Sequence, residues 1–269
     1  MAITAYNPTS TDYGYSNTSL NSINQSLTSG SRINSSADDP SGLAIITAMS
    51  SQITAENVGA QNALTGISML QTADGASESI TTALQRMSEL SLQAQNGTMN
   101  PSQRQALDAE FQQNLQEIGR IAESTQFNGQ NILNGDVSSV NIQMGDSSNA
   151  LAMPNLMTDV LGIDGLSLSD AAGASTAYEG LATALETVTT ARSEFGAQQN
   201  GLQAGAENLM NQSINTQASR SQIGDTNYAS AISEQMRERT LQDAQIMMQA
   251  QKNQNQGSVL QLLSGGGAI

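Results

Sequence analysis

The chain of 269 residues lacks cysteine, histidine and tryptophan, and Lys252 is its one lysine. Histidine and cysteine supply the commonest metal ligands and nucleophile–base pairs of enzymes, so their absence argues against a metal centre or a catalytic dyad. Carboxylates remain, but they occur in no pattern typical of a catalytic site. We therefore expect no enzymatic activity and no cofactor.

Aromatic residues and long apolar runs are also scarce. Aromatics make up 3% of the chain and hydrophobic residues 38%, which is thin for one large globular core. No window approaches the apolar length of a membrane-spanning helix, so we expect no membrane insertion. The first residues carry neither a basic segment nor an apolar core and do not resemble a cleaved signal peptide. A formal charge of −15 repels phosphate backbones, so nucleic acid is not an expected partner.

The dominant feature of the sequence is a stretch of apolar and small residues at heptad spacing. Asp39 is a good helix N-cap and Pro40 fits the first helical position, so a helix is predicted to run from Pro40 to Asn96. Such a helix would be about 85 Å long at 1.5 Å per residue, which predicts a coiled coil or long bundle. The heptad positions are Ile46, Ile53, Ala60 and Ile67, and after a phase slip near Asp74 they are Ala73, Ile80, Met87 and Ala94.

Further helices and one β-region are predicted downstream. Asn100, Pro101 and Gln103 form a capping box that begins a second helix, which should fold back antiparallel on the first. Arg104–Asp108 and Glu117–Arg120 have the spacing of ion pairs along this helix. Residues 140–144 read as a strand, and residues 161–168 could supply another. A capping box at Thr176 then predicts a second long heptad helix.

Each end of the chain carries a shorter amphipathic segment. A single helix of this length is marginal in water, so we expect these segments to pair with each other and to form on assembly. The N-terminal stripe consists of Leu20, Ile23 and Leu27. The C-terminal helix is predicted to begin at Tyr228, and its candidate assembly residues are Tyr228, Ile232, Met236, Leu260, Leu262 and Leu263. The predicted fold class is mainly α, with long antiparallel heptad helices forming a coiled-coil rod and a small β-hairpin region at about 130–175.

Three motifs in this order resemble those of bacterial flagellins. Residues 27–45, LTSGSRINSSADDPSGLAI, resemble the N-terminal signature of the family. Residues 126–133, QFNGQNIL, resemble its turn into the β-region, and residues 223–229, IGDTNYA, resemble its entry into the C-terminal helix. The resemblance covers about residues 18–145 and 176–263.

The resemblance implies a structural subunit that self-assembles into the bacterial flagellar filament for swimming motility. It implies an inner, discontinuous terminal coiled-coil domain, 1–39 with 225–269, and a long-helix domain, 40–224. Residues 145–175 leave no room for a large variable outer domain, so a minimal flagellin is expected. The alternative is a hook–filament junction protein, which shares the terminal helices. An enzyme or adhesin built on the same frame would need an inserted domain, and this segment is too short for one.

Partners and location also follow from the resemblance as expectations. The chain is expected in the extracellular filament, exported without a cleaved signal peptide. The implied partners are other copies of the chain, the flagellar export apparatus, a flagellin chaperone, and cap and junction proteins.

Some flagellins are recognised by a vertebrate innate immune receptor, and one segment here resembles that epitope. The matching residues are Arg86, Leu90 and Gln93, with Glu110 expected opposite, whereas Ser88 replaces the usual arginine. The competing interpretation is that Arg86 and Glu89 form an ordinary solvated pair on a helix that packs against a neighbouring subunit.

Overall fold

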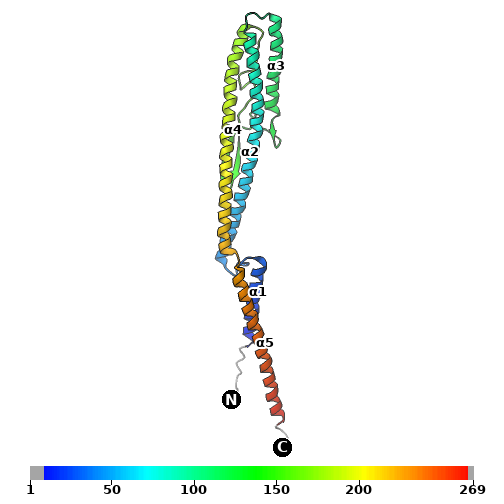
Figure 1. Ribbon diagram of the computed structural model, residues 1–269, viewed down its shortest axis with the longest axis vertical. Coiled ribbons are helices and arrows are strands. Elements are labelled where there is room, and N and C mark those ends of the chain that lie inside the picture. The colour runs from blue at the N-terminus through cyan, green and yellow to red at the C-terminus, as the bar shows by residue number, and fades with distance from the viewer. Residues whose placement is uncertain (1–8, 266–269) are drawn as a thin grey trace. The chain divides into compact units, whose positions relative to one another are not determined.

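The computed structural model describes residues 9–265, and the side-chain environment of residues 17–259. The chain forms two compact units, one of residues 1–51 with 216–269 and the other of residues 52–215. The predicted domain boundaries, 39/40 and 224/225, lie instead at the connections between helices, and that division of the chain stays a prediction. The elements of the described chain, coloured in order in Figure 1, are α1 (Thr9–Ser29), α2 (Pro40–Ala94), α3 (Pro101–Ser124), β1 (Gln126–Phe127), β2 (Gln130–Asn131), β3 (Ser139–Met144), β4 (Ser147–Ala152), α4 (Ala171–Gly224) and α5 (Tyr228–Gly265).

Both predicted helix starts in the first half of the chain are confirmed, and the caps explain them. The carboxylate Oδ1 of Asp39 accepts a hydrogen bond of 2.9 Å from the backbone N–H of Gly42, which leaves Pro40 as the first residue of α2. At α3 the side chain of Asn100 accepts from the N–H of Gln103, and the side chain of Gln103 accepts from the N–H of Asn100. These reciprocal bonds satisfy two N–H groups that a helix end would otherwise leave unpaired.

The predicted start of the second long helix at Thr176 is wrong. Helix α4 begins at Ala171, because Asp170 accepts a bond of 2.6 Å from the N–H of Gly173 and so acts as the cap. Thr176 lies one turn inside the helix, where its hydroxyl donates to the carbonyl of Ala172. The Thr176-to-Glu179 spacing mimics a capping box without being one.

The β-region consists of two hairpins. The larger one has two strands of six residues each, and the smaller one has two strands of two residues each. Strands β3 and β4 pair antiparallel, with Val140 opposite Leu151 and Ile142 opposite Asn149. The predicted strand at 140–144 is thus confirmed, whereas the segment 161–168 contains no strand. That segment turns at Gly162 and Gly165, which both have positive φ and no neighbouring atoms where a Cβ would lie.

The tip of the larger hairpin lies directly against α2. A Cβ added at Gly59 would come within 2.3 Å of the backbone nitrogen of Gly145, and the side chain of Asn62 donates to the carbonyl of Gln143 at 2.9 Å. A side chain at position 59 would therefore force the two backbones apart, so glycine is required there.

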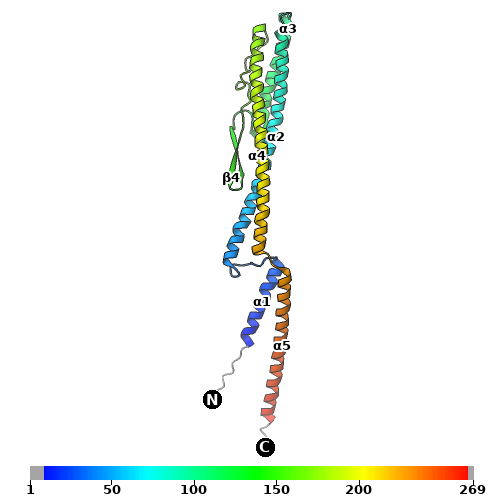
Figure 2. The same ribbon diagram turned by 60° about the vertical axis from the view of Figure 1, so that its left-hand side comes forward.

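The core of the second unit is the common face of α2, α3 and α4, which lie side by side (Figures 1 and 2). The predicted heptad residues Ala73, Ile80, Met87 and Ala94 are buried in it, and Ile67 packs against it. Ile53 and Ala60 are buried outside this cluster, and Ile46 is half-buried in the first unit. The hairpin and the loop after it cover the side of the core. The predicted class is confirmed: mainly helical, with a small β-hairpin region in the middle of the chain. The fully buried side chains of this core include Leu70, Ile80, Met87, Phe111, Ile118, Leu181, Val188, Phe195 and Leu202.

The first unit pairs the two chain ends, as predicted. Helices α1 and α5 lie side by side (Figure 2), and the connections that precede α2 and α5 meet in a short antiparallel bridge between Ser31 and Asp225. The N–H of Arg32 donates to the carbonyl of Gly224 at 2.6 Å, and the N–H of Thr226 donates to the carbonyl of Gly30 at 2.9 Å. We call residues 30–32 with 223–226 the clasp.

Candidate assembly surface

Four of the six residues on the face that α5 turns toward α1 are glutamines. Gln235 donates to Oδ1 of Asn24 at 2.5 Å, and Gln242 donates to Oδ1 of Asn17 at 2.9 Å. These two bonds, seven residues apart on both helices, fix α1 and α5 as antiparallel. The positions between Tyr228 and Val259 that are not exposed follow a 3–4 spacing and define what we call the seam: Ala231, Gln235, Glu238, Gln242, Gln245 and Gln249.

The apolar stripe of α1 packs into this seam. Leu20 is buried, and Ile23 and Leu27 are half-buried. The three residues predicted on α1 are therefore brought to one interface. The seam positions of α5 level with this stripe are, however, mostly polar, and Ala231 is the one apolar residue of the seam.

The apolar residues of α5 lie away from the seam. Met236 is 64% exposed and Met247 is 71% exposed, values typical of charged surface residues. A soluble helix normally buries such residues and exposes its glutamines. The pattern of α5 is thus unlike that of an ordinary amphipathic helix, because the seam is mostly polar and large apolar residues are exposed. These residues lie on several sides of the helix outside the seam, and we call them together the exposed apolar face: Tyr228, Ile232, Met236, Leu241, Ile246, Met247, Met248 and Val259.

The predicted assembly residues of α5 fall into two groups. Tyr228, Ile232 and Met236 belong to the exposed face. The side chains of Leu260, Leu262 and Leu263 lie outside the residues whose side chains the structure describes. The two amide bonds place Leu20 level with residue 239, so Leu260 follows about 30 Å further along α5 at 1.5 Å per residue. Contact between these leucines and the α1 stripe would have to come from another copy.

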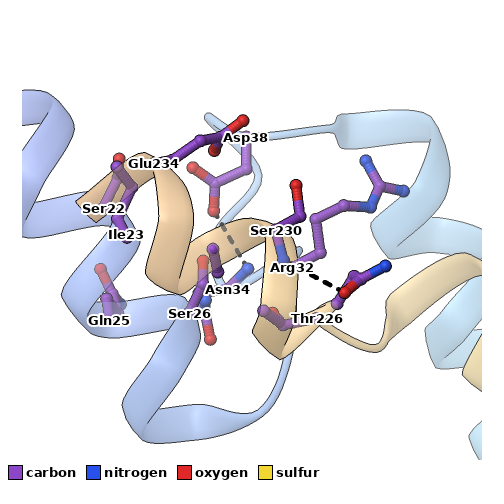
Figure 3. Close-up of a pocket in the computed structure, with 12 residues that line it drawn as sticks. Ser22, Ile23, Gln25, Ser26, Arg32, Asn34, Asp38, Thr226, Ser230 and Glu234 are labelled. Carbon is purple, nitrogen blue, oxygen red and sulfur yellow. Dashed lines mark hydrogen bonds between the residues drawn. The ribbon is translucent and has the colours of Figure 1, made fainter. Parts of the chain in front are cut away.

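A polar cleft of about 350 Å³ lies where α1, the start of α5 and the connection 30–39 meet (Figure 3). Oδ2 of Asp38 accepts bonds from the N–H groups of Asn34 and Ser35 at 3.0 and 2.9 Å. These bonds lower the pKa of Asp38 below its ordinary value because they favour the charged carboxylate, and the bond from Asn34 has the largest effect. Arg32 points its Nη2 at the carbonyl of Ile223, 2.7 Å away, at the end of α4.

The residues predicted for immune-receptor contact fall into two groups. Arg86 pairs with Glu110 of α3 at 2.7 Å and with Glu89 at 3.0 Å, and Glu110 is the main cause of the raised pKa of Arg86. Gln93 is exposed beyond this pair. Leu90, in contrast, is 1% exposed and belongs to the core. In this conformation a receptor that binds the surface would therefore not contact Leu90.

Two polar side chains of α3 have roles that helix spacing did not indicate. The predicted pair of Arg104 with Asp108 is wrong, whereas the Glu117–Arg120 pair is confirmed. Arg104 instead donates to the carbonyls of Ala94 and Asn96 at 2.9 and 3.0 Å, closing the end of α2. Asp108 accepts a hydrogen bond from the N–H of Leu168 at 2.6 Å and so holds the loop between β4 and α4 against α3. Such contacts between distant residues leave no local sequence signal.

None of the helices in the described residues, 9–265, is both long and apolar enough to span a membrane.

Two sequence families match the chain. Residues 3–138 match the bacterial flagellin N-terminal helical region, and residues 179–263 match the bacterial flagellin C-terminal helical region. The gap between them holds the hairpin and its following loop.

Curated relatives match over nearly their full lengths. A flagellin of Halalkalibacterium halodurans is 39% identical over 89% of this chain and 90% of its own length. A flagellin of Listeria monocytogenes is 32% identical over 92% and 93%, respectively. A flagellar filament 30.7 kDa core protein of Treponema maltophilum is 34% identical over 93% and 94%.

Solved structures agree with these relatives. The crystal structure of Bacillus cereus flagellin superposes with a TM-score of 0.52 and 32% identity, over 55% of this chain and 88% of that one. A putative flagellar hook-associated protein of Vibrio parahaemolyticus gives a TM-score of 0.60 over 70% of this chain and the whole of that one, but at 12% identity it shows a shared fold alone. From the two family matches and the full-length relatives, the chain belongs to the bacterial flagellin family.

Proposed function

We propose that this flagellin polymerises by covering the exposed apolar face of α5 with other copies of the same chain. The protein is a structural subunit of the flagellar filament, and the observation that carries the proposal is the reversed pattern of α5. Four of its glutamines lie in the seam with α1, while its described methionines, leucine and isoleucines remain exposed.

The free energy gained by burying these apolar side chains between copies is sufficient to drive assembly. Burying one large apolar side chain contributes roughly 1.5–3 kcal/mol. Several such residues lie on the exposed face of every subunit, and a helical polymer repeats the contact at each addition. The same residues in an isolated chain would favour non-specific association, which gives a reason for a covering partner before assembly.

A pair of substitutions on α5 tests the proposal. Met236→Gln with Met247→Gln keeps helix propensity and removes apolar area from the exposed face, so seeded polymerisation should fall by more than about tenfold. The matched control, Ser233→Gln with Ala250→Gln, introduces the same residue at exposed positions of the same helix and should polymerise normally. Polymer is measured by sedimentation and electron microscopy. Normal filaments from the methionine variant would overturn the proposal.

The junction-protein alternative has less support. The relatives described above, which match over nearly their full lengths, are flagellins and a filament core protein, and the hook-associated neighbour described above shares only the fold. A junction protein would form short rings or no polymer under seeding, so the same sedimentation experiment separates the two functions.

The remaining expectations rest on family membership. We infer that the chain is not an enzyme, and that it is exported to the extracellular filament without a cleaved signal peptide. Its further partners would be the export apparatus, a flagellin chaperone, and cap and junction proteins. The chaperone is the partner best supported by the chain itself, because the exposed face of α5 needs a cover before polymerisation.

Recognition by a vertebrate innate immune receptor also remains a proposal, and it involves Arg86, Gln93 and Glu110. Arg86→Ala should weaken receptor activation by soluble protein in a reporter assay, because arginine often contributes strongly to interfaces. Arg120→Ala, which removes another exposed arginine with a carboxylate partner, is the matched control. Full activity of Arg86→Ala would exclude the role.

A further inference from the structure

The seam between α1 and α5 offers nearly the same chemistry at successive positions. Amides recur on the seam at Gln235, Gln242 and Gln249, seven residues apart, with Gln245 between them. Asn17 and Asn24 of α1 use only the first two amides of this heptad series. Moving α1 by seven residues toward the end of α5, about 10 Å, would bring Asn24 level with Gln242 and Asn17 level with Gln249.

At the next site along the seam, Gln249 uses only half of its amide, since its Nε2 donates to Oδ1 of Asn253 at 3.4 Å and its oxygen has no donor among the described residues. Oε1 of Gln249 is buried and accepts no hydrogen bond from any described residue. A buried acceptor without a partner costs free energy, and a shifted Asn17 could supply the missing donor. The apolar stripe of α1 would again lie level with mostly polar seam positions after such a shift. The seam therefore discriminates weakly between one register and the next, unlike a coiled coil with a single buried polar pair.

The clasp, in contrast, exists in one register only. Two backbone hydrogen bonds join its strands, and Ser31 adds a bond of 3.1 Å from its hydroxyl to the carbonyl of Gly224. The guanidinium of Arg32 donates to the carbonyl of Ile223, an unpaired acceptor near the end of α4 where a positive charge is also favoured by the helix dipole. None of these contacts has an equivalent seven residues away.

We propose that the clasp, and not the seam, sets the register of α1 on α5, so that opening the clasp allows α1 to move along α5 by two helical turns. Ser31 and Arg32 are then positioning residues for the terminal helix pair. The connection 30–39 has ten residues and could span about 30 Å when extended, enough to follow a shift of 10 Å. The inference rests on the proposed function for its purpose, because the register decides which part of α5 is left for other copies.

The absence of cysteine makes the register directly measurable. A cysteine at position 20 is combined with one on the seam, in the otherwise intact chain. Leu20→Cys with Glu238→Cys reports the observed register, and Leu20→Cys with Gln245→Cys reports the shifted one. Disulfide formation is quantified by mass spectrometry in soluble protein and in seeded filaments.

The two reporters are compared in three backgrounds. With the native clasp, the first pair should form at least about tenfold more disulfide than the second, and with Ser31→Ala plus Arg32→Ala the ratio should fall to about threefold or less. Asn24→Ala plus Gln235→Ala, which removes one seam bond and leaves the clasp, should keep the native ratio. Arg32→Gln alone provides a milder opening if the double variant loses helix content by circular dichroism, and its ratio should lie between the other two.

Two results would overturn the inference. One is a native ratio in both clasp variants. The other is a shifted register in the seam variant, which would mean that the amide pairs set it. Filament yield, scored separately on the same samples, reports on the proposed function, so failed polymerisation with a changed disulfide ratio would separate the two proposals.

Discussion

The contact of Gly59 with the hairpin tip is a constraint carried by a single residue. A methyl group at position 59 would lie 2.3 Å from the nitrogen of Gly145 and 2.9 Å from the carbonyl carbon of Met144. Both atoms are backbone, so neither can rotate away. Gly59→Ala should destabilise the second unit by about 1–3 kcal/mol, as overpacking does, despite the higher helix propensity of alanine.

Gly75→Ala is the matched control for this prediction. Gly75 also lies inside α2, but nothing lies within 4 Å of the position of its Cβ. The control should therefore stabilise the unit by about 1 kcal/mol. Urea unfolding followed by circular dichroism measures both, and equal behaviour of the two variants would contradict the docked position of the hairpin tip.

Asp38 gives a pH dependence whose sign follows from its hydrogen bonds. Because the pKa of Asp38 is lowered in the folded chain, its bonds to the N–H groups of Asn34 and Ser35 stabilise the connection at pH values above the ordinary carboxyl pKa. This contribution is lost as the pH falls through the lowered value. Amide-exchange protection at Asn34 and Ser35 should therefore fall in that acidic range.

The variant Asp38→Asn serves as the control for the pH effect. Its amide oxygen can still accept hydrogen bonds but carries no charge, so protection of the two N–H groups should be lower at neutral pH and should not change on acidification. Unchanged protection in the wild-type chain down to strongly acidic pH would show that the carboxylate does not hold this turn.

At the scale of helices, Arg192 joins α4 to α2. Its Nε lies 2.8 Å from Oδ1 of Asp74, and this bond is the main cause of the raised pKa of Arg192. The side chains of Arg192 and Asp74 are 31% and 36% exposed, so the pair is better shielded from solvent than Arg120 with Glu117. Arg192→Met should cost about 1 kcal/mol of unfolding free energy, at the upper end for partly exposed pairs.

Arg120→Met is the comparison, because Arg120 pairs within its own helix. Its removal should have no measurable effect on thermal unfolding, and 1 M salt should reduce the difference between the two variants. An equal loss of stability in both would mean that the link between α2 and α4 contributes nothing specific.

Local sequence predicted the helices well where their signals are complete. Asp39 with Pro40 and Asn100 with Gln103 place caps, and the heptads behind them supply the buried face, so local and long-range requirements agree. At Thr176 the same type of signal failed, because Asp170 offered a competing cap one turn earlier. Residues 161–168 alternate like a strand but end up anchored to α3 through Asp108 and Gln112, which sequence spacing does not reveal.

The candidate surface was predicted in composition but not in orientation. Leu20 is buried and Ile23 and Leu27 are half-buried on α1, while their role in assembly stays a prediction. The predicted start of α5 at Tyr228 is confirmed. Packing of the C-terminal leucines on that stripe, in the same or an adjacent chain, stays a prediction. Periodicity alone did not indicate that polar positions of α5 would face α1, because it does not say which of two faces a neighbour takes. The amide bonds of Gln235 and Gln242 decide it, and they depend on tertiary register.

At the scale of the whole molecule, charge is divided unequally between the units. Residues 1–51 with 216–269 contain five cationic and seven anionic residues, a net of −2, whereas residues 52–215 contain four and seventeen, a net of −13. The four arginines of the second unit are all engaged within the chain, at Glu110, at the end of α2, at Glu117 and at Asp74. Subunits brought together in a polymer therefore repel one another through this unit.

This repulsion predicts that polymerisation depends on ionic strength. Raising salt from about 20 to 200 mM shortens the Debye length to less than about 10 Å and should increase the rate of seeded growth several-fold, as followed by light scattering. A variant with four exposed glutamates of α4 replaced by glutamine, at positions 179, 186, 194 and 207, should need less salt. Growth that is independent of salt, or slower at high salt, would exclude electrostatic control.

The tip of the larger hairpin and the turns of the loop after it differ in a way that bears on the use of this protein as a scaffold. The tip of the larger hairpin is held against α2 at Gly59, so a foreign peptide inserted at Gly145 would have to lift the tip away from the helix. The turns at Gly162 and Gly165 point into open space at the surface. Ile163, which lies between them, is fully buried in the core, so a tag or antigen would have to be inserted next to one of the glycines with Ile163 retained. Filaments could then display it in many regularly spaced copies.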